Sequence, residues 1–172
     1  GAAVLAAPVL AQARPVTLVV PFPPGGSTDV MARLLAERMA PILGQPMLVE
    51  NRPGGATVVG AEAVLRAAPD GQTVLVNSGT TMTIHPLIMR GLSYKVQDFA
   101  PVSLLSVLPF AFLVQNRLPA TVPEFVAHAK ANPGRLNYGT NGPSSFNNIV
   151  AVMIADAFGI RMQDVTYRGD AQ

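Results

Sequence analysis

The residues whose types and spacing best suit chemistry lie between positions 17 and 29, which read Thr-Leu-Val-Val-Pro-Phe-Pro-Pro-Gly-Gly-Ser-Thr-Asp. The apolar run predicts a strand, the prolines and glycines predict a tight loop, and the periodic residues that follow predict a helix. The first turn of such a helix carries N–H groups without partners inside the helix, at the positive end of the helix dipole. Glycine also lets a ligand approach the backbone closely. This pattern suits the binding of an anion, most simply a carboxylate.

A second segment repeats this order of elements. A strand at residues 136–138 runs into Gly-Thr-Asn-Gly-Pro-Ser-Ser at 139–145, and a helical stripe of apolar residues extends from Phe146 to Phe158 before a glycine ends it. Two such helix beginnings that face each other across a cleft would clamp the two sides of a small anion. A third polar stretch, residues 77–81, directly follows a predicted strand, where α/β sheets bind ligands, although an ordinary turn explains it equally well.

These three loops supply the candidate ligand contacts, and the sequence leaves a second interpretation open for several of them. Ser27 and Thr28 either bind ligand oxygens or cap the helix. Asp29 either stabilises the helix dipole or accepts the ammonium group of an amino-acid ligand. Tyr138 either faces the site or packs in the core. The full set of candidates is Phe22, Pro24, Gly25, Gly26, Ser27, Thr28, Asp29, Asn77, Ser78, Thr81, Tyr138, Thr140, Asn141 and Ser145.

The composition argues against several other kinds of site. Hydrophobic residues make up 49% of the 172 residues and charged residues 13%, with a net charge of +2, which indicates a globular protein. The basic residues are scattered, so the sequence shows no nucleic-acid footprint. The chain has no cysteine and its two histidines, His85 and His128, lie far apart in sequence, which argues against a structural zinc site. We therefore expect no metal and no cofactor, and we interpret His85 as a loop residue.

The elements that must position these loops alternate between strand and helix, which predicts an α/β architecture. The run Thr-Val-Pro-Glu from Thr121 has the pattern of a capping box. Residues 99–107 and 109–115 read as extended segments that carry the chain from one lobe into another. The predicted strands are 17–20, 46–50, 73–76, 136–138 and 164–167, and the predicted helices are the one that stops at Gly44 and those at 57–67, 121–131 and 146–158.

The first thirteen residues have a different character. Residues 1–13 are rich in Ala, Val, Leu and Pro and end in Ala11-Gln12-Ala13, which predicts the apolar half of a secretory signal followed by its cleavage site. A disordered alanine-rich tail is the alternative. On the first interpretation the chain is cleaved near Ala13, and the mature protein begins near Arg14 and is soluble outside the cytoplasm. The stretch is too short to span a bilayer.

Four segments together resemble the signatures of the Bug or TctC family, the periplasmic substrate-binding proteins of tripartite tricarboxylate transporters. They are the proline–glycine loop at 21–29, Val-Glu-Asn-Arg-Pro-Gly-Gly-Ala at 49–56, Tyr-Gly-Thr-Asn-Gly at 138–142 and Val-Thr-Tyr-Arg-Gly at 165–169. The resemblance implies an α/β fold of the type II periplasmic-binding-protein kind, a two-lobed Venus flytrap. Because family members run to roughly twice this length, the chain is expected to be a truncated fragment.

The resemblance also implies how the lobes and the ligand are arranged. The first lobe would cover residues 14–103 and an incomplete second lobe residues 104–172, with the carboxylate gripped mainly by backbone amides and bridging water. One part of the second loop departs from the family pattern, which often has Gly-Ser and then a His-Leu pair. This chain instead has Pro143, which lacks an N–H donor, and later Asn147 and Asn148.

The function implied by the resemblance is that of an extracytoplasmic solute-binding protein. It would be a monomer without enzymatic activity that captures a small carboxylate and delivers it to the membrane permease of a tripartite tricarboxylate transporter. Tricarboxylates, dicarboxylates, acidic amino acids and aromatic acids all remain open as ligands. A ligand sensor that signals to a membrane receptor is an alternative function. An α/β hydrolase is another, but neither Ser27 nor Ser144 lies in a G-x-S-x-G motif, and no activating base is apparent.

Overall fold

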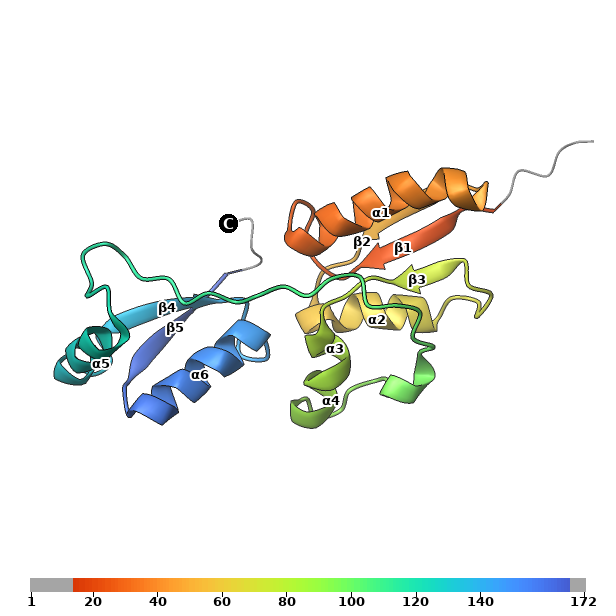
Figure 1. Ribbon diagram of the computed structural model, residues 1–172. Helices are drawn as coiled ribbons and strands as arrows, with labels where there is room; N and C mark the ends of the chain where they lie inside the picture. Colours follow the sequence, from red (N-terminus) through yellow and green to blue (C-terminus); the bar gives the residue numbers. More distant parts are fainter. Residues whose placement is uncertain (1–13, 168–172) are drawn as a thin grey trace, which may run out of the picture.

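The computed structural model describes residues 14–167 of the chain. The predicted signal remnant, residues 1–13, and the end of the segment 165–169 lie outside the described residues. The described part forms two α/β units joined by an extended segment (Figure 1). Each unit has its own parallel sheet, with the strand order β2-β1-β3 in the first and β4-β5 in the second. The strand–helix alternation predicted from the sequence is confirmed.

The elements keep close to their predicted positions, with shifts of one or two residues at several ends. The first unit contains β1 (Val16–Val20), α1 (Ser27–Leu43), β2 (Met47–Asn51), the 3₁₀ turn η1 (Gly55–Thr57), α2 (Val58–Leu65), β3 (Thr73–Leu75), α3 (Gly79–Thr83), α4 (His85–Ile88) and the 3₁₀ turn η2 (Val96–Asp98). The second unit contains α5 (Val122–Ala131), β4 (Leu136–Thr140), α6 (Phe146–Phe158) and β5 (Met162–Thr166).

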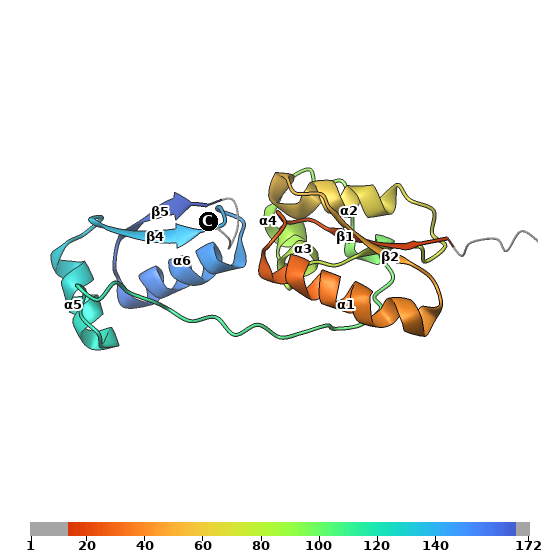
Figure 2. The same ribbon diagram turned by 90° about the horizontal axis from the view of Figure 1, so that it is seen from above.

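Strand β1 forms the centre of the first unit. It pairs in parallel with β2 on one side and with β3 on the other, while α1 and α2 cover opposite faces of the sheet (Figures 1 and 2). A strand covered on both faces needs a continuous apolar run, which explains why Leu18, Val19 and Val20 are all buried. Ala32 and Ala36 of α1 pack on this strand, so the small residues let the helix lie close to the sheet.

The carboxyl ends of β1 and β3 leave the sheet side by side. Val19 is the register partner of Leu75, and the N–H of Val76 donates to the carbonyl of Val19 over 2.9 Å. The chain beyond β1 therefore enters the proline–glycine loop next to the place where the chain beyond β3 reaches Asn77. Both ends face the second unit, and the carboxyl end of β4 faces the first unit (Figure 1).

Residues 79–88 fold into α3 and α4, two short helices that the sequence did not predict. The interpretation of His85 as a loop residue is wrong, because His85 is the first residue of α4 and is only 2% exposed. A contact between residues distant in sequence helps to hold α3: the hydroxyl of Tyr94 donates to the carbonyl of Thr81 over 2.8 Å. The local periodicity of the sequence gives little sign of such a contact.

The segment between the units is extended, as predicted, and contains no strand. Many of its apolar side chains are exposed, among them Leu104 at 79% and Leu113 at 87%. Phe110 packs against Phe146 with ring centroids 4.8 Å apart, so the end of the segment is anchored on the second unit. The boundary predicted between residues 103 and 104 falls within this segment and stays a prediction.

The second unit is built around the parallel pair β4 and β5, in which Leu136 is the register partner of Met162. Phe125 and Ala129 of α5 form its core together with Ile160. The predicted capping box at the start of α5 lacks the side chain–backbone hydrogen bonds that define such a box. The hydroxyl of Thr121 donates to the carboxylate of Glu124 over 2.7 Å, and no side chain caps the backbone, because a carboxylate is the stronger acceptor for that hydroxyl.

Two residues before α2 adopt left-handed backbone conformations that side chains disfavour. They are Ala56 with φ 51° and Thr57 with φ 78°, so α2 begins later than the sequence predicted. A β-branched residue such as threonine rarely adopts this conformation. None of the helices in residues 14–167 is long and apolar enough to cross a membrane.

Candidate functional site

The beginning of α1 presents backbone N–H groups at the end of the sheet. Gly25 has φ 87°, a conformation that favours glycine, and Gly26 is the N-cap residue in an extended conformation. Among residues 14–167, neither the N–H of Gly26 nor that of Thr28 donates a hydrogen bond. These two N–H groups lie at the positive end of the helix dipole, and they remain able to bind an anion, as predicted for this loop.

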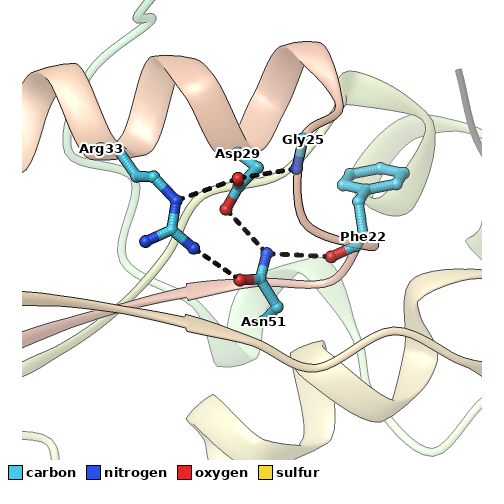
Figure 3. A network of polar contacts seen from close by, with 5 residues as sticks. All are labelled: Phe22, Gly25, Asp29, Arg33 and Asn51. Carbon is cyan, nitrogen blue, oxygen red and sulfur yellow. Dashed lines mark hydrogen bonds and ion pairs between the residues drawn. The ribbon is translucent and has the colours of Figure 1, made fainter. Parts of the chain in front are cut away.

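Asp29 anchors the loop from inside the first turn of α1 (Figure 3). One carboxylate oxygen accepts hydrogen bonds from the Gly25 N–H at 2.9 Å and from the Arg33 Nε at 3.0 Å, and the other accepts from Asn51 Nδ2 at 2.8 Å. The side chain is only 3% exposed. The Arg33 hydrogen bond lowers the pKa of Asp29 to about 2, against the effect of burial and with help from Gly25 and Asn51. Asp29 is therefore ionised, and its charge is balanced by Arg33.

Asn51 extends this network to the beginning of the loop. Its Nδ2 also donates to the carbonyl of Phe22 over 3.1 Å, and its Oδ1 accepts from Arg33 over 2.9 Å (Figure 3). The loop is thus fixed at Phe22 and at Gly25, so its backbone is held in place before any ligand arrives. The Gly25 N–H is already bonded to Asp29 and is not free to bind a ligand.

Two members of this network, Arg33 and Asn51, were not among the residues predicted for the site. The spacing of Asp29 and Arg33, four residues apart on one helix, is a signal that predicts an ion pair. Asn51 carries no such signal, because its contact depends on the pairing of β1 with β2. Pro24 lies exposed on the loop, and Ser27 lies exposed as the first residue of α1.

The chain beyond β3 adds polar groups beside this loop. The Nδ2 of Asn77 is buried and has no hydrogen-bond partner in the described part of the chain. Ser78 is the N-cap residue of α3. Thr81 is fully buried, and its hydroxyl forms a 2.8 Å hydrogen bond with the hydroxyl of Thr57. Of the three predicted contacts, Asn77 keeps a side-chain donor without a partner in residues 14–167, whereas Thr81 ties α3 to the turn before α2.

In the second unit, most predicted side chains hold the loop between β4 and α6. The Thr140 hydroxyl donates to Asp164 over 2.6 Å and accepts from the Gly142 N–H over 3.1 Å. The Ser145 hydroxyl donates to the Gly142 carbonyl over 2.6 Å and caps α6 by accepting from the Asn148 N–H over 3.3 Å. Thr140 and Ser145 therefore shape the loop rather than point free groups at a ligand.

Like α1, α6 begins with backbone N–H groups that have no hydrogen-bond acceptor in the described part of the chain. The N–H groups of Phe146 and Asn147 donate no hydrogen bond within residues 14–167. The contacts predicted for this unit lie on side chains of the loop, whereas these N–H groups belong to the first turn of the helix. Tyr138 accepts a 3.5 Å contact from Asn148, and Asn141 lies exposed on the loop. The beginnings of α1 and α6 both lie on the side where the two units meet (Figure 2).

His85 begins α4 and is almost fully buried. Burial lowers the pKa of His85, and the nearby backbone of Ser144 partly opposes that effect. The Nδ1 of the ring is buried and has no partner in the described part of the chain.

A surface hollow of about 690 Å³ lies away from these loops, against α1 and the edge strand β2. None of the predicted contacts lines it, and it lies on a free sheet edge rather than at the carboxyl ends of the strands. We therefore do not assign the ligand to it. The residues that line the hollow are Thr17, Arg33, Ala36, Glu37, Met47, Leu48, Val49 and Glu50.

Within the described residues no group of three or more acidic, histidine or cysteine side chains is placed to hold a metal ion.

Comparison with known proteins gives a consistent result. Residues 31–172 match the family described as "Tripartite tricarboxylate transporter family receptor". The chain is 36% identical over 160 residues to a UPF0065 protein of Bordetella pertussis, covering 92% of this chain and 50% of that protein. It is also 36% identical over 171 residues to Protein BugT of the same organism, covering 96% and 52%. The chain thus spans about half the length of these relatives.

Solved structures of similar sequence share the fold. The structure described as "R. palustris Rpa4515 with adipate" superimposes with a TM-score of 0.85 at 31% identity, covering 92% of this chain and 54% of that one. The structure of MatC (Rpa3494) from Rhodopseudomonas palustris with bound malate gives a TM-score of 0.81 at 33% identity, covering 91% and 54%. The predicted fold class, that of the periplasmic binding proteins, is confirmed by these neighbours together with that of BugD.

Proposed function

The chain belongs to the tripartite tricarboxylate transporter receptor family, and from that premise we propose that it captures a small carboxylate between two lobes. The observation that supports this most strongly is the pair of helix beginnings on the facing sides of the two units. Within residues 14–167, the N–H groups of Gly26 and Thr28 in one unit and of Phe146 and Asn147 in the other donate no hydrogen bond. Backbone N–H groups at a helix beginning favour negative charge.

The charges around the first loop support an anionic ligand. The negative charge of Asp29 would oppose an anion at the beginning of α1, but Arg33 balances it through an ion pair of 3.0 Å. The Nδ2 of Asn77, buried without a partner in the described part of the chain, adds a donor beside the same loop. A buried donor without an acceptor is unfavourable, and a carboxylate oxygen would satisfy it.

The ligand class follows from the same groups and from the relatives. Two solved relatives carry adipate and malate, which are dicarboxylates, so a dicarboxylate is the first class to test. Tricarboxylates and aromatic acids present the same terminal group. The Asp29 carboxylate already accepts three N–H donors, which disfavours the alternative in which it binds the ammonium group of an amino acid.

We place the protein in the periplasm as a monomer that delivers its ligand to the permease of a tripartite tricarboxylate transporter. Closure of the lobes around the ligand would present a joined surface to that partner. A sensor of the same ligand would use the same closed form. The hydrolase alternative gains no support, because the buried Nδ1 of His85 has no hydrogen-bond partner within residues 14–167, so no carboxylate there orients the ring through that atom. We propose no catalytic step.

The experiment that tests the proposal is calorimetric titration of the protein expressed from its complete gene with malate, succinate, adipate, citrate and glutamate. Gly26→Val is the informative variant. Gly26 has ordinary backbone angles, and a Cβ there would meet only the Pro23 carbonyl oxygen at 3.8 Å, so the fold tolerates the side chain. We expect the added side chain to crowd an anion at the neighbouring N–H groups and to weaken binding by at least about tenfold, which corresponds to about 1.4 kcal/mol.

Ala120→Val serves as the matched control, since it places the same side chain at an exposed position just before α5. We expect its affinity to equal that of the wild type. Two results would contradict the proposal: no binding of any acid by the wild-type protein, or equal affinity of the wild type and Gly26→Val for the acid that binds best.

A further inference from the structure

Asn51 is the last residue of β2 and lies outside the proline–glycine loop to which the proposed function assigns the ligand. Its register partner is Val20, the last residue of β1 before that loop. The N–H of Arg52 donates to the carbonyl of Val20 over 2.8 Å, so the pairing of β1 with β2 continues to the point where the loop begins. This pairing sets the side chain of Asn51 against the loop (Figure 3).

The side-chain amide of Asn51 is fully used in this position. Its Nδ2 carries two hydrogens, and it donates to the Asp29 carboxylate over 2.8 Å and to the Phe22 carbonyl over 3.1 Å. Its Oδ1 accepts from Arg33 over 2.9 Å. The position therefore requires two donors and one acceptor in one short planar group. Aspartate has the same shape without a donor, and serine or threonine has only one donor.

The loop itself has few backbone groups with which to hold its shape. Residues 21, 23 and 24 are prolines, which have no N–H, and Gly25 adds conformational freedom. Side chains outside these residues must therefore hold the loop. Asp29 holds it at Gly25 and Asn51 holds it at Phe22. Because Asn51 also bonds to the second carboxylate oxygen of Asp29, its amide joins the two points at which the loop is fixed.

We propose that Asn51 is a positioning residue of the ligand site, which sets the affinity for a carboxylate without touching it. Its polar atoms are already bonded within the protein, and through Phe22 and Asp29 they hold the N–H groups of the first turn of α1 in place. A loop that is ordered before binding loses less conformational entropy when the ligand arrives. This inference rests on the proposed function and adds a residue of the neighbouring strand to its site.

The affinity of three variants tests the inference in the protein expressed from its complete gene. The probe is whichever of malate, succinate and adipate the wild type binds best in calorimetry. Asn51→Leu keeps the approximate size of the side chain without its donors or acceptor and should weaken binding about tenfold. Asn51→Asp keeps the acceptor for Arg33 but has no donor, and it should weaken binding at least as much. Asn137→Leu is the matched control, because it makes the same change at an exposed position of β4, and it should bind like the wild type.

Hydrogen exchange of the protein without ligand, followed by NMR, separates positioning from a general loss of stability. In Asn51→Leu the Gly25 N–H should exchange about tenfold faster than in the wild type, because Asp29 has lost the amide that fixes its other oxygen. The Val76 N–H, which bonds β3 to β1, should change less. In the wild type, the Nδ2 protons of Asn51 should exchange more slowly than those of the exposed Asn137, since both are hydrogen-bonded.

The outcomes separate this inference from the proposed function. Equal affinity of the wild type and folded Asn51→Leu would overturn the inference and leave carboxylate capture standing. Equal acceleration of exchange at Gly25 and Val76 would do the same, because it would show a general loss of stability. Nδ2 protons of Asn51 that exchange as fast as those of Asn137 would also overturn it, and this measurement needs no variant that folds. If the wild type binds none of the acids, both proposals fail together.

Discussion

Asp29 is the residue on which the shape of the first loop most depends. It joins the Gly25 N–H, the Arg33 guanidinium and the Asn51 amide through a nearly inaccessible carboxylate. Of the two interpretations left open by the sequence, this arrangement favours a role within the protein over a contact with the ligand. The role goes beyond that of a dipole partner, because Asp29 ties the helix to the loop before it and, through Asn51, to strand β2.

The depressed pKa of Asp29 predicts how the stability of the protein depends on pH. The pKa is lowered from 3.8 to about 2, so the ionised form contributes about 2 kcal/mol to stability. A carboxylate with a lowered pKa stabilises the fold above its ordinary pKa, and the contribution is lost as the pH falls from about 4 to about 2. Urea unfolding should therefore show Asp29→Asn to be less stable than the wild type by about 2 kcal/mol at neutral pH, with the gap closing near pH 2.

Asp156→Asn is the control for this measurement, since Asp156 is exposed on α6. Its stability should follow that of the wild type at every pH. A gap between Asp29→Asn and the wild type that stays constant from neutral to acid pH would show that the charge of Asp29 does not contribute.

At the scale of residues, the sequence predicted the glycine-rich loops, but it did not show which of their polar groups bond within the protein. Gly25 and Gly26 looked equivalent in the sequence, yet only the Gly25 N–H bonds to Asp29. Ser145 and Thr140 looked like ligand contacts, yet their hydroxyls bond within the second unit. Which polar group bonds within the protein depends on its neighbours in three dimensions, and a local sequence pattern does not encode these neighbours.

At the scale of elements, the long strands and helices were predictable because their apolar residues follow a regular period and glycines end the helices. Gly44 with φ 65° and Gly159 with φ 62° end α1 and α6 as expected. The short helices α3 and α4 were not predictable; α3 is held by contacts of Thr81 with Tyr94 and Thr57, which lie far from it in sequence. The strained turn before α2 was equally hidden, since nothing local marks Ala56 or Thr57 as left-handed.

The hydrogen bond between Thr57 and Thr81 is the contact that holds this strained turn against α3. Both side chains are buried and their hydroxyls lie 2.8 Å apart. Removing one hydroxyl leaves the other without a partner, which costs about 1–3 kcal/mol. We expect Thr81→Val to lower the free energy of unfolding by that amount in urea titrations.

A double-mutant cycle separates this bond from other effects of the substitution. Thr57→Ala removes the partner hydroxyl, so Thr57→Ala combined with Thr81→Val should be less destabilising than the sum of the single changes by about 1 kcal/mol. Strict additivity of the two changes would show that the hydroxyls do not interact in solution.

At the scale of the whole molecule, the arrangement of the two units brings the two parts of the candidate site to the side where the units meet. Each unit has a parallel sheet whose carboxyl end faces the other unit (Figure 1), and each presents a helix beginning there. The repeat of strand, glycine-rich loop and helix predicted two such helix beginnings across a cleft. The two-lobed organisation itself was implied by the resemblance to the Bug or TctC family.

The central claim is that N–H groups at the beginnings of α1 and α6 bind the same carboxylate. The most direct test is to follow assigned amide resonances by NMR while the acid that binds best in calorimetry is added. The account predicts the largest shifts at the backbone amides of Gly26, Thr28, Phe146 and Asn147 and at the side-chain amide of Asn77. Shifts confined to the hollow beside β2, at Leu48 and Glu50, with those five amides unmoved, would contradict it.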